Sequence, residues 1–145
     1  MEGFGFSTEI RVRFAETDAQ GIAHHANYFV WFELARVMYL EEHAGGYQKL
    51  RDEGYEATVV EGHARFLVPA RFDDRLRLWT RCADVRGARF RYEYVLERPS
   101  DGARIADGWT SHACVDARTL RPTRLPQWLV DAVATAESSA SAAAP

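Results

Sequence analysis

The chain has 145 residues, of which 47% are hydrophobic and 27% charged, and it carries a net charge of −3. This size suits one domain with a sizeable core, which argues against disorder, and the acidic balance argues against nucleic-acid binding. No run of about 18 apolar residues predicts an integral membrane segment, and the N-terminus lacks the pattern of a secretory signal. Cys82 and Cys114 are too few for a disulfide framework. We therefore expect a cytoplasmic protein with two buried, reduced thiols.

The charges are unevenly distributed along the chain. Residues 1–62 carry 5 basic and 11 acidic side chains, whereas residues 63–145 carry 13 and 10. All cations except Lys49 are arginines, whose planar guanidinium suits phosphate and carboxylate groups. A bias in genomic base composition is the simpler cause of this excess.

The first predicted element is a half-buried strand over residues 8–14. In this stretch Ile10, Val12 and Phe14 alternate with charged residues. Residues 15–27 are small and polar and include a glycine, which predicts a shaped loop leading into a helix.

The next predicted element is a long helix over residues 27–44, with Asn27 as its N-cap and Gly45 as its stop signal. Its apolar residues cover nearly the whole circumference, so we expect it to be buried on most sides. A short second helix is predicted over residues 47–53.

Long alternating stretches then predict four further strands, with a turn at residues 99–102. Their connections are too short for crossover helices, so the sheet must be mostly antiparallel. The fold class is therefore α+β, with a five-stranded antiparallel sheet wrapped around one long central helix. The open edges of such a sheet favour self-association. The strand stretches are residues 56–70, 75–85, 88–98 and 103–116, followed by a closing helix at 126–137, which ends the domain at 137, and a disordered low-complexity tail at 138–145.

The loop before the long helix concentrates the polar chemistry of the chain. The first turn of a helix exposes unpaired N–H groups and a partial positive charge, which can stabilise an oxyanion formed from a carbonyl. Asp18 lies a few residues upstream across Gly21 and could act there as a nucleophile or as a base for water. Acyl transfer is the reaction class that this arrangement supports. The simpler alternative is that Asp18 only binds backbone N–H groups of its own turn.

For the histidines and Glu33, structural or surface roles are simpler interpretations than catalysis or metal binding. His24 and His25 are adjacent, so in an extended segment they would point in opposite directions and would rarely bind one metal. Glu33 precedes Arg36 by three residues, which predicts a buried ion pair, with catalysis by Glu33 at a subunit seam as the alternative. Structural or surface roles are expected for His43, His63 and His112.

The segment from Arg13 to Arg36, RFAETDAQGIAHHANYFVWFELAR, resembles the signature of the 4-hydroxybenzoyl-CoA thioesterase family of hot-dog folds. It is most similar to the acyl-CoA thioesterase branch associated with the bacterial Tol-Pal system. The stretch HACVDARTLRPTRLP resembles the last strand and following turn of that family, so the likeness spans about residues 8–126. The positions that match the signature are Asp18, Gly21, His25, Asn27 and Tyr28.

This resemblance implies a homodimer or homotetramer with its site at the seam between two subunits. Asp18 would be the catalytic carboxylate, and the backbone N–H near His25 would polarise the thioester carbonyl. Coenzyme A is part of the substrate, so no metal or redox cofactor is called for. The residues expected to bind substrate are Gly21, Asn27 and Tyr28, together with Arg86, Arg89, Arg118 and Arg121, which would bind the nucleotide end of coenzyme A.

The expected function is hydrolysis of an acyl-CoA with a small or medium acyl group, aliphatic or aromatic. Two alternatives stay open from the sequence. One is the 3-hydroxyacyl-CoA dehydratase or enoyl hydratase chemistry of other hot-dog proteins, which would use Asp18 with His24 or His25. The other is a module that binds acyl-CoA without turning it over.

Overall fold

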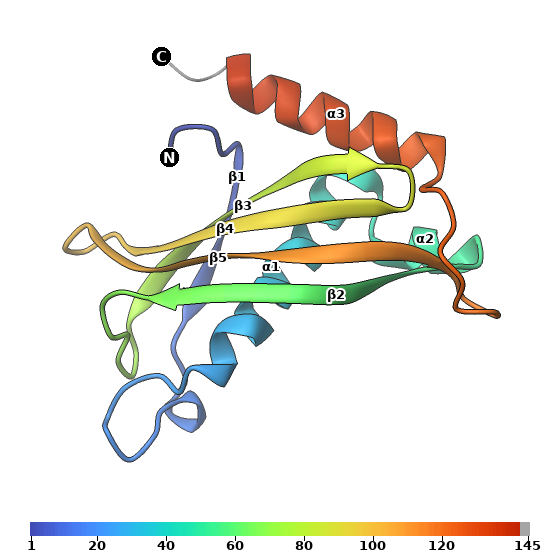
Figure 1. Ribbon diagram of the computed structural model, residues 1–145. Helices are drawn as coiled ribbons and strands as arrows, with labels where there is room; N and C mark the ends of the chain where they lie inside the picture. Colours follow the sequence, from blue (N-terminus) through green and yellow to red (C-terminus); the bar gives the residue numbers. More distant parts are fainter. Residues whose placement is uncertain (143–145) are drawn as a thin grey trace.

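The computed structural model describes residues 1–142 as a sheet packed against helices (Figure 1). The predicted elements are all present, with shifts at their ends. In chain order they are β1 (Phe6–Arg11), the 3-10 helix η1 (Phe14–Glu16), α1 (Ala26–Ala44), α2 (Tyr47–Asp52), β2 (Tyr55–Phe66), β3 (Arg75–Arg86), β4 (Arg89–Arg98), β5 (Ala103–Asp116) and α3 (Gln127–Ala142).

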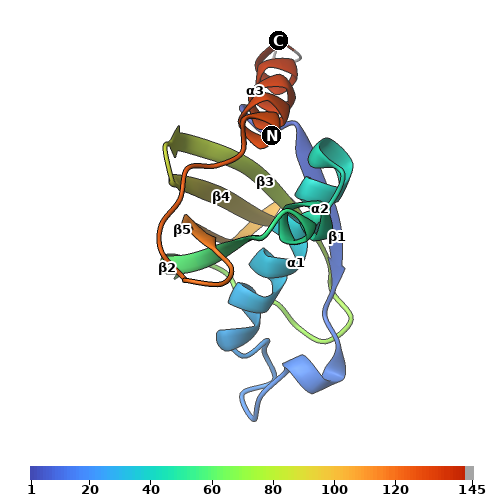
Figure 2. The same cartoon turned by 90° about the vertical axis from the view of Figure 1, so that its right-hand side faces the viewer.

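The five strands form one sheet in the order β1-β3-β4-β5-β2, and every neighbouring pair is antiparallel. The long helix α1 connects the two edge strands and lies inside the curve of the sheet, while α3 runs alongside β3 (Figure 2). The predicted α+β fold class is therefore confirmed.

The core lies between α1 and the concave face of the sheet. On β4 the side chains of Phe90, Tyr92, Tyr94 and Leu96 are all buried, as their alternation predicts. Phe32 of α1 stacks flat on Tyr94, with ring centroids 4.1 Å apart. This contact fixes the helix over the centre of the sheet.

One side of α1 is open to solvent in the single chain, so the prediction that it is buried on most sides was wrong. The sheet covers only the face that carries Tyr28, Trp31 and Phe32. The opposite face is exposed because no element of residues 1–142 packs over it. The apolar side chains on that face are Phe29, Val30, Leu34, Val37 and Met38.

The first strand is shorter at its C-terminal end than predicted. It ends at Arg11 and the chain turns into η1, so Phe14 points outward with 75% of its surface exposed instead of joining the buried face. There the Phe14 ring packs edge-on against Phe72. The alternation of buried and exposed side chains therefore ends at the buried Val12.

The closing helix is longer than predicted. It continues through Ala142, so the expected disordered tail was wrong for residues 138–142, and residues 143–145 lie outside the described part of the chain. Glu137 anchors this helix, because its Oε1 accepts hydrogen bonds from the Tyr39 hydroxyl at 2.5 Å and the Cys82 amide at 3.0 Å. Within residues 1–142 no helix combines the length and apolarity needed to cross a bilayer.

Candidate active site

The loop that carries Asp18 is closed on itself by backbone hydrogen bonds. Thr17 and Ala23 form an isolated antiparallel bridge, and the Asp18 amide donates to the Ile22 carbonyl at 3.0 Å. The turn at its tip passes through Gly21, whose φ of +76° favours glycine. The loop therefore has a defined shape immediately before α1.

The carboxylate of Asp18 is half-buried and only partly used by this turn. Its Oδ1 accepts a hydrogen bond from the Gln20 amide at 2.8 Å, which is the turn-stabilising role considered for it from the sequence. The other oxygen, Oδ2, accepts no hydrogen bond from residues 1–142. One carboxylate oxygen is therefore free to meet a ligand.

The helix begins one residue earlier than predicted, and its N-cap is His25, not Asn27. The Asn27 side chain instead donates hydrogen bonds to the carbonyls of Glu16 and His24, at 2.9 and 3.2 Å. The prediction of an Asn27 cap was wrong because these carbonyls, brought close by the loop, engage its amide group.

The His25 backbone N–H has no acceptor within residues 1–142. The next amide, that of Ala26, makes only a long hydrogen bond of 3.3 Å to Nδ1 of His24. Unpaired amides at a helix start carry partial positive charge and can receive an oxyanion. Both donors lie where the sequence predicted an oxyanion site.

The two adjacent histidines lie with their rings together, so the expectation of opposite directions was wrong. Their ring centroids are 4.3 Å apart with an interplanar angle of 31°. The reason is that His25 has helical backbone angles, φ −58° and ψ −29°, and not the extended ones assumed. Both rings are exposed, and that of His25 faces the ring of Phe66 edge-on.

Glu16 holds the loop against α1 and was missed by the sequence analysis. Its carboxylate is buried and accepts hydrogen bonds from the Trp31 indole N–H at 2.7 Å and the Arg13 amide at 2.8 Å. Its backbone carbonyl accepts from the His24 amide at 2.8 Å. A carboxylate three residues after Arg13 fits a capping box, but no local pattern points to Trp31.

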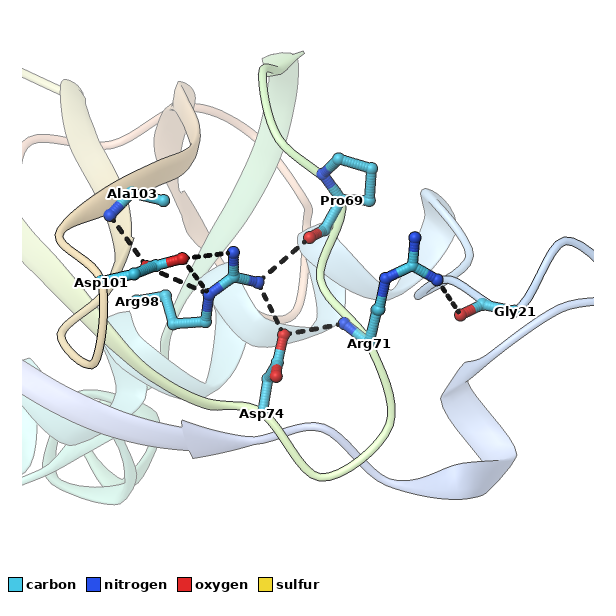
Figure 3. Close-up of polar contacts among 7 residues, drawn as sticks. All are labelled: Gly21, Pro69, Arg71, Asp74, Arg98, Asp101 and Ala103. Carbon is cyan, nitrogen blue, oxygen red and sulfur yellow. Dashed lines mark hydrogen bonds and ion pairs between the residues drawn. The ribbon is translucent and has the colours of Figure 1, made fainter.

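A second set of contacts supports the loop from the segment before β3 (Figure 3). The guanidinium of Arg98 donates to the Pro69 carbonyl, Asp74 and Asp101. Asp74 in turn accepts from the Arg71 amide, and the Arg71 side chain donates to the Gly21 carbonyl at 3.4 Å. The carboxylates of Asp101 and Asp74 raise the pKa of the Arg98 guanidinium. The tip of the Asp18 loop is thus linked to the turn between β4 and β5.

Tyr28 and Glu33 occupy different environments from those expected. Tyr28 is almost fully buried against Trp31 and Phe66, and this burial raises the pKa of its hydroxyl. Glu33 is paired with Arg36 as predicted, but the distance is 3.7 Å and 69% of the Glu33 side chain is exposed. The expectation of a buried Glu33 was therefore wrong, because the face of α1 that carries it is uncovered.

The four arginines expected to bind coenzyme A lie far from Asp18 within one chain. Arg86 and Arg89 face each other across the β3–β4 turn and line a surface pocket of about 400 Å³. Arg118 and Arg121 lie in the turn after β5, and the segment following that turn contacts the β3–β4 turn through a hydrogen bond from the Leu125 amide. Figure 1 shows these turns at one end of the sheet and the loop before α1 at the other.

The sequence of residues 12–133 matches the family model of the thioesterase-like superfamily. The chain belongs to this superfamily. The putative acyl-CoA thioesterase YneP of Bacillus subtilis is 31% identical over 124 residues, which cover 83% of this chain and 89% of that protein. The acyl-CoA thioesterase YbgC of Haemophilus influenzae is 35% identical over 124 residues, covering 85% and 90%.

Solved structures of similar proteins share the fold of this superfamily member. Protein TT1821 of Thermus thermophilus, described as hypothetical, has a TM-score of 0.83 at 35% identity, covering 89% of this chain and 97% of that one. The DHNA-CoA thioesterase of Staphylococcus aureus has a TM-score of 0.82 at 27% identity, covering 94% and 90%. The predicted hot-dog fold and the predicted enzyme class, a thioester hydrolase, are confirmed.

Proposed function

We propose that the protein hydrolyses acyl-CoA thioesters with small or medium acyl groups, aliphatic or aromatic. The observation that carries this proposal is that one short loop at the start of α1 holds both a carboxylate oxygen and a backbone amide that have no hydrogen-bond partner among residues 1–142. Asp18 supplies the carboxylate and His25 the amide. Relatives named as acyl-CoA thioesterases support the choice of substrate class.

In the proposed reaction the thioester carbonyl oxygen accepts hydrogen bonds from the amides at the start of α1. The positive end of the helix stabilises the negative charge that develops as the carbonyl carbon becomes tetrahedral. Asp18 either attacks this carbon or takes a proton from an attacking water. The carbon–sulfur bond then breaks. If water attacks, the proton taken by Asp18 passes to the leaving sulfur, and coenzyme A and the free acid are released. If Asp18 attacks, the leaving thiolate takes a proton from solvent, and a water then hydrolyses the acyl–aspartate anhydride to the free acid and regenerates the carboxylate. This chemistry needs water and no metal or redox cofactor.

We also propose that two subunits complete the site. Strand β2 is an edge strand with exposed apolar residues, among them Val60 and Phe66, which favours pairing with a second copy. If two β2 strands pair antiparallel about a twofold axis, the Phe66 end of one meets the Tyr55 end of the other. Tyr55 lies opposite Asp116 of β5 in the sheet register, just before the turn that carries Arg118 and Arg121. A homodimer, or a homotetramer of two such dimers, therefore brings Asp18 close to arginines of the partner.

These arginines fit the anionic end of coenzyme A in the proposed complex. Arg118 and Arg121 of the partner subunit would bind phosphate groups, with Arg86 and Arg89 farther along the same face. We propose a cytoplasmic location for the protein. The free, buried Cys82 suits a reducing compartment.

The test is release of free coenzyme A from a panel of short, medium, branched and aromatic acyl-CoAs, followed with a thiol reagent. We expect Asp18→Asn to lower kcat by about a hundredfold or more, because the amide can neither attack nor accept a proton. The matched control is Asp52→Asn, which changes an exposed carboxylate on α2. The proposal fails if the wild type is inactive on the whole panel or if Asp18→Asn keeps the wild-type kcat.

The same panel separates the two alternative functions. Enoyl-CoA absorbance arising from a 3-hydroxyacyl-CoA without thiol release would indicate a dehydratase. Tight acyl-CoA binding without turnover, unchanged by Asp18→Asn, would indicate a binding module.

A further inference from the structure

A large cavity lies between α1 and the sheet, away from the Asp18 loop. Its volume is about 370 Å³, and most of its wall is apolar, from α1, α2, the central strands and α3. Among the lining residues, Glu33, Val37 and Val59 are exposed and mark an open side. A volume of this size suits a small organic group.

Arg36 places a positive charge in the wall of this mostly apolar cavity. Only 15% of its side chain is exposed, and within residues 1–142 its one ion pair is the 3.7 Å contact with the solvent-exposed Glu33. Taking a guanidinium out of water costs free energy that a distant, hydrated carboxylate repays only in part. Arg36 is therefore a half-buried cation that lacks a close anionic partner among residues 1–142.

The groups around Arg36 do not supply the missing negative charge. His112 is buried, and burial together with the charge of Arg36 lowers its pKa to about 3, so the ring is neutral. Burial also raises the pKa of Tyr92 well above its usual value, so this hydroxyl stays protonated. Burial likewise raises the pKa of Tyr94, whose hydroxyl is hydrogen-bonded to Thr110 and is a neutral hydrogen-bond partner of Arg36. Among the described lining residues the charged groups are thus the exposed Glu33 at the open side and the positive charge of Arg36 inside.

The open side of the cavity lies between α1 and β2, because its exposed lining residues are Glu33 and Val37 of α1 and Val59 of β2. Phe29 of α1 packs next to Gly62 of β2, since a Cβ at Gly62 would lie 3.0 Å from the Phe29 ring. Nearer the start of the helix, His25 faces Phe66 at the end of β2. The start of α1 and the open side of the cavity therefore both border β2, the edge strand where a second subunit would join.

We propose that this cavity receives the acyl group of the substrate and that Arg36 selects acyl groups that carry an anionic oxygen at their far end, a carboxylate above all. This inference rests on the proposed thioesterase function. A terminal carboxylate would form charge-assisted hydrogen bonds with the planar guanidinium. A methyl-terminated chain would bury Arg36 further and give it no partner. The acyl-CoAs of dicarboxylic acids are therefore the preferred substrate class.

The test compares pairs of substrates that differ only at the far end of the chain: hexanoyl- and adipoyl-CoA, octanoyl- and suberoyl-CoA, and decanoyl- and sebacoyl-CoA. For the best-fitting length we expect the wild type to prefer the carboxylate member in kcat/KM by about tenfold or more. Arg36→Met should remove this preference, mainly through KM of the carboxylate substrate. A purely structural role of Arg36 would change both members of a pair equally.

Two further variants sharpen the test. Glu33→Gln should increase the preference for the carboxylate member, because it removes the carboxylate that competes for Arg36. The matched control is Arg75→Met, which removes the same charge from an exposed residue paired with Glu9 at the other side of the sheet. It should leave the ratio unchanged.

A binding measurement keeps this inference separate from the proposed function. Calorimetry of the wild type with the stable thioethers S-hexyl-CoA and S-(5-carboxypentyl)-CoA, and with their eight- and ten-carbon counterparts, needs no turnover and no variant that must fold. Tighter binding of the carboxylate thioether at one length supports the role of Arg36 even if no acyl-CoA is hydrolysed. Equal or weaker binding of the carboxylate member at every length, or an unchanged substrate ratio in a folded Arg36→Met, overturns it.

Discussion

The carboxylate of Glu16 offers a direct test of how the loop is positioned. Each of its oxygens accepts one hydrogen bond, Oε2 from the Trp31 indole and Oε1 from the Arg13 amide. Glu16→Gln keeps the shape of the side chain but replaces one oxygen with an NH₂ group. Whichever way the amide turns, one of the two donors then faces another donor.

The cost can be estimated from burial, since only 4% of Glu16 is exposed. A buried donor left without an acceptor costs about 1–3 kcal/mol. For a chain of this size that corresponds to a fall in Tm of about 3–10 °C. Trp31→Phe removes the indole N–H but keeps an aromatic ring, so adding it to Glu16→Gln removes the clash at this position. The double variant should be more stable than the sum of the two single effects by about 1 kcal/mol or more.

Glu16→Gln should also lower the rate of catalysis, because Glu16 holds the loop that carries Asp18, two residues further on. We expect kcat of Glu16→Gln to fall while KM stays close to that of the wild type, with partial recovery of kcat in the double variant. Thermal unfolding followed by circular dichroism and the coenzyme A release assay provide the two measurements. Additive stability effects, or a lower Tm with unchanged kcat, would refute the proposed link between this carboxylate and the loop.

Three other predictions concern the core. As pH falls below 6.5, the unfolded chain protonates His112 while the folded chain does not until about pH 3, so stability is lost on acidification. His112→Gln should reduce the slope of unfolding free energy against pH, measured in urea, by up to about 1.4 kcal/mol per pH unit, and equal slopes would contradict this. Burial raises the pKa of both Cys82 and Cys114, so a thiol reagent should modify them only after unfolding, and fast reaction of the native protein would show otherwise. Gly108→Ala should lower the urea midpoint, because its methyl group would overlap the His63 carbonyl of β2; an unchanged midpoint would mean that the strands separate at little cost.

The strands could be predicted because burial on one face imposes a period of two. Phe90, Tyr92 and Tyr94 are buried as that period requires. The end of α1 was equally readable, since Gly45 takes the left-handed conformation that terminates it. The outward turn of Phe14 was not, because the alternating pattern gives no sign that the backbone leaves the sheet after Arg11.

For the candidate site, sequence reasoning found residues that are close along the chain. Asp18 and His25 lie on one loop at the start of a helix. The loop and the start of the helix can both be predicted from local sequence patterns. The contact of Glu16 with Trp31 depends on how β1 packs beside α1, and the half-buried state of Arg36 depends on which face of α1 the sheet covers. Such tertiary contacts have no signature in spacing or composition.

The guanidinium of Arg98 joins the turn between β4 and β5 to the segment from Pro69 to Asp74, and through Asp74 and Arg71 it is linked to the carbonyl of Gly21. Two of its carboxylate partners belong to surface turns, where sequence changes are usually harmless. A substitution at Asp101, in the turn between β4 and β5, would therefore weaken the contacts that hold the loop of Asp18. Variants that alter turnover should thus be sought at this hairpin as well as beside Asp18.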